Sequence, residues 1–148
     1  MEAWLEAWLE SMNNLSSFGP DFLEDVIHLI ESLGFQIAES DLFSLGFCVQ
    51  KTEQEIKNAC NVSTVPPELY QVAKGLIVAD FLTMKKISGT IGGVNLDFEP
   101  ILKELQEGDT KQVFAVDSVS SAEQRLDSFI ALMNLGREQF IRFRRLQW

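Results

Sequence analysis

The segment from about residue 68 to residue 87 constrains the fold most, because its apolar residues would cover most sides of a helix. A helix of that kind is stable only when other elements surround it. Pro66 and Pro67 precede the segment and Gly89 follows it, which favours a helix with defined ends. We therefore expect a central helix in a helical bundle. Its apolar residues are Leu69, Val72, Ala73, Leu76, Ile77, Val78, Phe81 and Leu82.

Three other segments have the apolar spacing of helices that could cover the central one. They run over about residues 20–33, 41–60 and 121–135. Gly34 and Gly136 directly follow the first and the last of them, and glycine commonly ends a helix. The positions expected to face inward include Leu42, Leu45, Phe47, Cys48 and Ile56 in the second segment, and Leu126, Phe129, Ile130 and Met133 in the third.

Residues 88–117 predict a small β element beside the helices. The stretch "SGTIGGVNLDF" contains three glycines and is typical of a loop or hairpin tip, whereas "EPILKELQEG" indicates a short helix. The stretch "TKQVFAVDS" combines β-branched and aromatic residues in partial alternation, which favours a strand. One strand cannot satisfy its own backbone, so it must pair with residues 91–96 or with another subunit.

The expected fold is therefore mainly α: a small helical bundle with a short β-hairpin or strand element and extended terminal arms. A chain of 148 residues is most simply one domain and is long enough to bury a core. We expect three parts. They are an acidic, Trp-rich N-terminal helix or arm over residues 1–18, a helical core over residues 19–136, and a basic, aromatic segment over residues 137–148.

The N-terminus repeats EAWL, EAWL and ES over residues 2–12. A period of four puts its acids on one stripe of a helix and places Trp4 and Trp8 together on a neighbouring stripe. A helix this short is marginal alone in water, so its tryptophans must pack against something. Two alternatives stand: the helix docks on its own domain, or it is a partner-binding arm. Membrane-surface binding is disfavoured, because the polar face carries only acids.

Charge is divided unevenly along the chain. The last twelve residues, "REQFIRFRRLQW", hold four arginines and one acid, whereas the residues before them hold 8 Lys and Arg against 21 Asp and Glu. Nine acids precede the first base, Lys51. A net charge of −10 argues against binding a nucleic-acid backbone over a broad surface, because such binding needs clustered cations.

Targeting signals and membrane spans are not evident in the sequence. The N-terminus is acidic where a secretory signal would be basic. No apolar run approaches the ~20 residues that a membrane-spanning helix needs. We therefore expect a protein that is made and kept in a cytoplasm, with no membrane contact.

Patterns that would indicate catalysis or metal binding are also missing from the sequence. His28 is the only histidine and has no Cys or His neighbour at ligand spacing, so we expect an ordinary helix residue. Cys48 and Cys60 would lie about 18 Å apart on one helix, too far for a disulfide, so we expect reduced, buried thiols. Asp80 either pairs inside the bundle or points to water, and we favour water. We expect no enzyme, no metal and no cofactor.

Aromatic and basic residues are interleaved at the C-terminus, and three interpretations compete. They could grip nucleic acid through phosphate contacts and base stacking. They could insert into an acidic or aromatic-lined groove of a partner protein, which we favour because the acidic body repels DNA. They could instead form a final helix that packs its aromatics on the bundle and leaves its arginines in solvent. The candidate partner-binding residues are Phe140, Arg142, Phe143, Arg144, Arg145 and Trp148.

Several short motifs follow one another between about residue 22 and the end of the chain. They are "FCVQKTEQEIKNACN" with the following "VPPELYQVAKGLIVADFLTMKKISG", then "LDFEPILKELQEGDT", "EQRLDSFI" and "FIRFRRLQW". In order and spacing they resemble the small helical head–tail connector (adaptor) proteins of tailed bacteriophages and prophages. The matching positions are Ile56, Lys57, Asn58, Phe81, Leu82, Lys85, Lys86, Glu107, Gly108, Asp109, Thr110, Gln124, Arg125, Asp127, Phe140, Arg142, Arg144 and Trp148.

Two positions depart from the family pattern. Phe143 stands where the family usually has tyrosine, and Gln147 where it usually has lysine, so polar contacts there would differ. Residues 1–18, with both N-terminal tryptophans, have no counterpart in the resemblance.

The resemblance implies a structural virion protein without catalytic activity. Such proteins form a ring, dodecameric in the family, beneath the portal protein, with a tail-side neck or tail terminator protein as the next partner. The C-terminal segment would reach toward the portal, and DNA would pass through the lumen without sequence-specific binding. The ring would belong to the neck of the virion and be assembled in the bacterial cytoplasm. The alternative is a soluble helical regulatory or nucleic-acid-binding module that uses its basic C-terminus.

Overall fold

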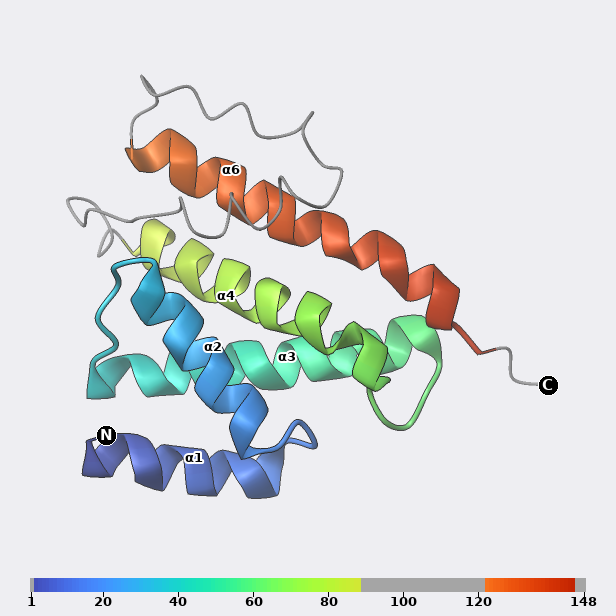
Figure 1. Cartoon of the computed structure of the whole chain (residues 1–148), viewed down its shortest axis with the longest axis horizontal. Coiled ribbons are helices and arrows are strands. Elements are labelled where there is room, and N and C mark those ends of the chain that lie inside the picture. The colour runs from blue at the N-terminus through green and yellow to red at the C-terminus, as the bar shows by residue number, and fades with distance from the viewer. Residues whose placement is uncertain (1, 89–121, 146–148) are drawn as a thin grey trace.

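The computed structural model describes residues 2–88 and 122–145. Every regular element in these two ranges is a helix, which confirms the expected mainly α fold for them (Figure 1). The β element and the short helix expected after Ser88 lie outside the described residues. The α-helices are α1 (Ala3–Leu15), α2 (Pro20–Ser32), α3 (Leu42–Cys60), α4 (Tyr70–Ile87) and α6 (Ala122–Asn134), and the 3-10 helices are η1 (Glu39–Asp41), η2 (Pro67–Leu69) and η3 (Leu135–Phe143).

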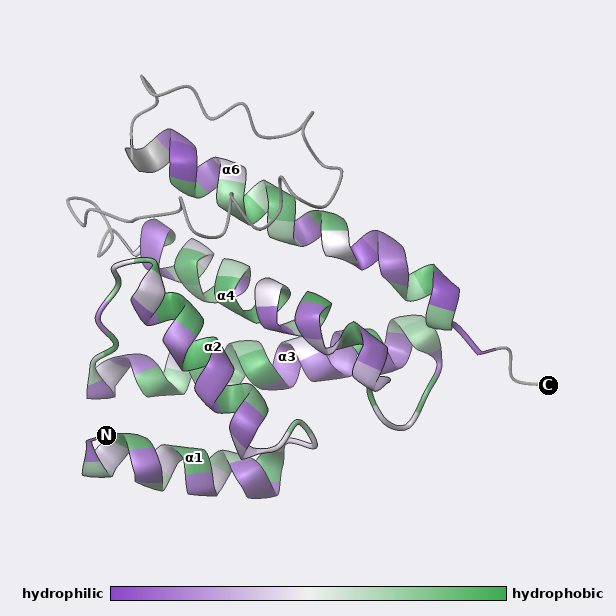
Figure 2. Ribbon diagram, in the orientation of Figure 1, coloured by the Kyte–Doolittle hydropathy of each residue, from purple (hydrophilic) through white to green (hydrophobic). Residues whose placement is uncertain are grey.

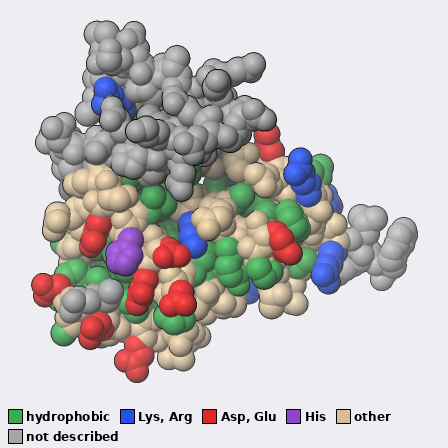
Figure 3. All heavy atoms as spheres, viewed as in Figure 1, with side chains coloured by type: hydrophobic (Ala, Val, Ile, Leu, Met, Phe, Trp, Pro, Cys, Tyr) green, Lys and Arg blue, Asp and Glu red, His purple; other side chains and the backbone are tan. Residues whose placement is uncertain are grey.

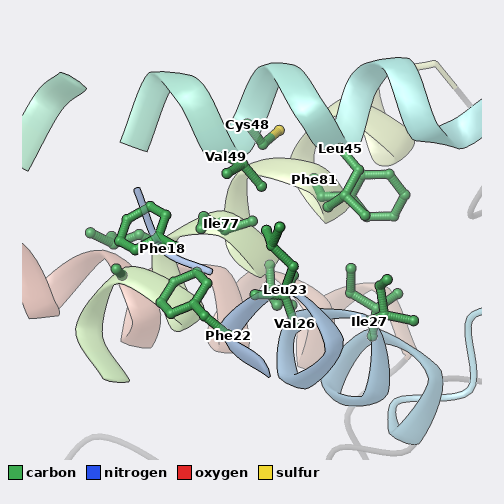
Figure 4. Packing of buried hydrophobic residues seen from close by; sticks show 14 of the residues in the cluster. Phe18, Phe22, Leu23, Val26, Ile27, Leu45, Cys48, Val49, Ile77 and Phe81 are labelled. Atoms are coloured by element: carbon green, nitrogen blue, oxygen red, sulfur yellow. The ribbon is translucent and has the colours of Figure 1, made fainter. Parts of the chain in front are cut away.

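Helix α4 is the centre of the bundle, as its apolar composition predicts. It packs against α2, α3, α6 and η3. Figure 4 shows side chains of α2 and α3 meeting those of α4, with Ile77 between the two other helices. Phe81 is fully buried, and its ring lies edge-on to Phe35 with centroids 5.5 Å apart. Truncating a buried ring of this kind to alanine typically costs about 3–5 kcal/mol, so α4 contributes much of the stability.

The N-terminal helix α1 docks on its own domain. Its inner stripe of Leu5, Leu9 and Met12 is buried against α2 and α3, and hydrophilic and hydrophobic bands alternate along it (Figure 2). The segment that follows α1 is also tied down, because the backbone N–H and the hydroxyl of Ser17 both donate to the carboxylate of Glu53 on α3. Of the helix or arm expected over residues 1–18, the structure therefore shows a helix, docked on its own domain.

The carboxylate of Glu53 is the polar centre of this connection. Burial opposes its ionisation, but hydrogen bonds from Ser17 and from Lys57, whose Nζ lies 3.1 Å away, outweigh that effect and lower the pKa of Glu53. The charged carboxylate therefore holds the α1–α2 connection against α3.

The two glycines expected to end helices behave differently. Gly34 follows α2 with a φ of +96°, a left-handed conformation that side chains disfavour, so that helix does end there. Helix α6 ends at Asn134, two residues before Gly136, and the chain continues directly into η3. A Cβ atom at Gly136 would come within 2.8 Å of Val72 Cγ1 on α4. The expected helix end near Gly136 is confirmed, and Gly136 is also small because η3 passes close to α4.

Candidate partner-binding site

The basic C-terminal segment begins with an ion-pair cluster between η3, α3 and α4. The guanidinium of Arg137 forms a two-pronged pair with Glu55, with Nη2 to Oε1 at 3.1 Å, and lies 4.0 Å from Asp80. The hydrogen bond with Glu55 raises the pKa of Arg137. Asp80 also pairs with Lys51 at 3.3 Å. The preference for Asp80 pointing to water is therefore wrong, because two cations hold it against the bundle.

The three-residue period of a 3-10 helix decides which side chains of η3 face the bundle. Arg137, Phe140 and Phe143 share one stripe, and Phe140 on that stripe is 6% exposed and belongs to the core. Phe143 is partly buried against the same core. Phe140 was expected to contact a partner. This expectation needs correction, because its ring is buried in the core of the bundle. The expected boundary between core and C-terminal segment at residue 136 lies close to the change from α6 to η3 at Asn134 and Leu135.

Backbone hydrogen bonds fix the chain as far as Arg145. Helix α3 ends at Cys60, and Asn61 follows in a left-handed conformation with a φ of +57°. The last carbonyls of a helix lack partners within it. Here the N–H of Arg145 donates to the carbonyl of Cys60 at 2.7 Å, and the side-chain amide of Asn61 donates to the carbonyl of Arg145 at 3.0 Å. The C-terminal end of α3 therefore holds the segment that follows η3 in place through these two hydrogen bonds.

Three arginines lie at the end of η3 and in the segment that directly follows it. Arg142, Arg144 and Arg145 are all exposed. Trp148, another of the candidate partner-binding residues, lies outside the described residues. Acidic side chains gather over the part of the surface formed by the N-terminal helices, and basic ones near the C-terminal end (Figure 3). The structure thus brings together the three arginines and separates them from Phe140.

The N-terminal candidates Trp4 and Trp8 are both half-buried and pack against the core. Trp8 lines a groove between α1 and α3 together with Phe43 and Phe47. Phe47 was expected to face inward but is 53% exposed, which corrects that position, and Phe43 is 87% exposed. Neither phenylalanine was recognised as a candidate, although their spacing of four residues repeats that of the tryptophans on α1.

Reactive groups are scarce in the described part of the chain. Cys48 and Cys60 are buried and unpaired with each other, as expected, and burial raises the pKa of Cys48 to about 12. Within residues 2–88 and 122–145, no group of three or more His, Cys, Asp or Glu side chains could hold a metal ion. His28 is exposed on α2. Among the helices of these ranges, none combines the length and apolar character that crossing a membrane requires.

Comparison of the chain with models of known protein families, with curated proteins and with solved structures gives no match.

Proposed function

We propose that this chain is a structural virion protein that forms the connector ring between the portal and the tail of a tailed bacteriophage. The observation that carries the proposal is the division of charge: three exposed arginines stand at one end of an otherwise acidic helical bundle. The ordered motifs that resemble head–tail connectors support the same function. The protein acts by binding and has no catalytic role.

The basic end is suited to gripping a partner protein because the fold holds its backbone in place. An interface that orders flexible side chains and loops on binding loses affinity to that ordering. Here the hydrogen bonds at Cys60 and Asn61 fix the backbone up to Arg145 before any partner arrives. Arg142, Arg144 and Arg145 would then meet acidic or aromatic groups of the portal, and Trp148 follows three positions later in the sequence.

The acidic body is suited to lining a channel through which DNA moves. Nine acids and no Lys or Arg occupy the first 50 residues, which form α1, α2 and the start of α3. A surface of like charge repels the phosphate backbone, so DNA would slide past without adhering. A tail-side neck or tail terminator protein would bind the opposite rim of the ring.

The test is a binding titration with the portal protein of the phage or prophage that encodes this chain. The double variant Arg142→Ser/Arg144→Ser should weaken portal binding at least about tenfold, the effect expected when interfacial charge pairs are broken. The variant Arg142→Lys/Arg144→Lys keeps the charge and separates its loss from the loss of guanidinium geometry. Unchanged binding by the serine variant would refute the anchoring role.

The same exposed arginines favour one alternative, a small helical module that binds nucleic acid. That function requires affinity that falls steeply with salt, because phosphate contacts release counterions. A gel-shift titration at about 50 mM and 200 mM salt distinguishes the two. The connector function predicts no stable complex with a short duplex. A complex that forms at low salt and is lost in Arg142→Ser/Arg144→Ser would favour the alternative.

A further inference from the structure

An apolar groove lies between α1 and the first half of α3, and the proposed function leaves it unused. Its volume is about 280 Å³, and its walls are Trp8 and Leu15 from α1 and Phe43 and Phe47 from α3. Leu15, Phe43 and Phe47 are 61%, 87% and 53% exposed. Contiguous exposed apolar side chains of this size usually mark a surface that another molecule covers.

The helices meet closely at the base of the groove, so its shape is part of the fold. A Cβ atom at Gly46 would lie 3.5 Å from Met12 Sδ and 3.6 Å from Trp8 Nε1, which is ordinary packing distance. Met12 is buried, and Trp8 packs against the core. Packed side chains and backbone therefore fix the shape of the groove, and its aromatic residues are in position before any partner binds.

The charge around the groove indicates what kind of molecule can cover it. Among the described residues, no charged side chain lines the groove, and the outward face of α3 continues it with Gln50, Gln54 and Asn58. Two charged residues, Lys51 and Glu55, also line this outward face, but each is paired, with Asp80 and Arg137 respectively, so the face has no net charge. We call the groove and this outward face of α3 the neutral strip. It is a neutral surface on a protein with a net charge of −10.

We propose that the neutral strip is the surface through which one copy of this chain contacts the next, an inference that rests on the proposed ring. Copies that each carry −10 repel one another wherever their acids face, so they can approach closely only where those acids are absent. The cores of protein interfaces are likewise depleted in charged residues and enriched in aromatic ones. Closing a ring needs a head-to-tail contact, so the strip meets a different face of the neighbouring copy.

The groove of the neutral strip lies apart from the basic end, whereas the outward face of α3 runs on to Asn58, two residues before Cys60. The groove lies at the first half of α3, whereas Arg145 is anchored at Cys60, the last residue of that helix. The 19 residues of α3 span about 28 Å at 1.5 Å per residue. One copy can therefore contact its neighbour with the groove while its arginines contact the portal.

Sedimentation of the full chain across the micromolar-to-millimolar range tests the proposal. The wild-type protein should self-associate, and the association should strengthen as salt rises from about 0.1 M to 1 M, because salt screens the repulsion between acidic copies. The variant Phe43→Gln/Phe47→Gln should raise the dissociation constant at least tenfold. The single variant Phe43→Gln, at the more exposed position, is the fallback if the double variant does not fold.

The matched control is Ile141→Gln, because Ile141 is 77% exposed and lies on η3, outside the strip. It should associate like the wild type. A wild-type protein that stays monomeric at every salt concentration would overturn the inference, as would equal association by the double phenylalanine variant. Association that weakens with salt and depends on Arg142 would assign the contact to the basic end instead. Portal binding is titrated separately, so the proposed function can stand if the strip fails.

Discussion

Replacing Phe140 with alanine should destabilise the protein strongly, although the residue lies only eight positions before Trp148. Its ring is 6% exposed and belongs to the main core cluster, and its carbonyl accepts a hydrogen bond from the thiol of Cys60 at 3.4 Å. The substitution keeps the backbone bond and removes only the ring. It therefore reports whether the basic end is part of the fold or a separate arm.

Burial sets the size of the expected effect. Truncating a buried phenylalanine to alanine costs about 3–5 kcal/mol, through lost transfer free energy and the cavity that remains. Domains of this kind unfold with a free energy of about 5–15 kcal/mol, so the loss is a large part of the total. At about 2–4 °C per kcal/mol, the melting temperature should fall by about 6–20 °C.

Urea denaturation followed by circular dichroism measures the change, with Ile141→Ala as the control. Ile141 is the next residue and is 77% exposed, so its truncation should change stability by less than about 0.5 kcal/mol. Equal, small effects of the two substitutions would refute the packing of η3 on the bundle. Such a result would also contradict the inference that the fold holds the backbone of the arginine-bearing segment in place.

Three further predictions test other parts of the structure. The lowered pKa of Glu53 means that its carboxylate stabilises the fold above its ordinary pKa near 4.5 and loses that effect as pH falls through the lower folded value, so Glu53→Gln should flatten the acid side of a stability–pH curve. Gly136→Ala should destabilise by about 1–3 kcal/mol through overlap with α4, whereas Gly46→Ala should stabilise by about 0.5–1 kcal/mol, as thermal melts can show. Iodoacetamide at pH 8 should leave Cys48 and Cys60 unmodified until denaturant is added, which mass spectrometry detects, because burial raises the pKa of both thiols.

The sequence predicted the elements that local patterns decide. Leu76 and Phe81 stand in an apolar run too broad for a surface helix, so a central position for α4 followed directly. Gly34 ended α2 as expected because its left-handed conformation is a local property of the chain.

The errors and omissions fall where a residue is small, buried or charged because of a distant neighbour. The sequence predicted the end of α6 near Gly136, but it did not show that Val72 of α4, more than sixty positions earlier, also requires a small residue there. Phe140 stands among arginines, yet a period of three instead of 3.6 turns it toward the bundle. Asp80 was expected to face solvent because Arg137, one of its two partners, lies far from it in the sequence and is brought close only by the fold.

The exposed phenylalanines show a further limit of helical periodicity. Phe43 and Phe47 have a spacing that suits a buried stripe as well as an outward one. Which side of α3 they occupy depends on where α1 crosses it, near Gly46, and that crossing is a tertiary contact. An uncharged outward face on an acidic chain is the signal that could have identified them.

Electron microscopy of phage particles assembled with this protein tests the proposed function most directly. A connector predicts a ring of density between portal and tail, with the bundle around the DNA channel and Arg142, Arg144 and Arg145 against the portal. Particles that lack such density, or that place the three arginines in solvent without a protein contact, would contradict it.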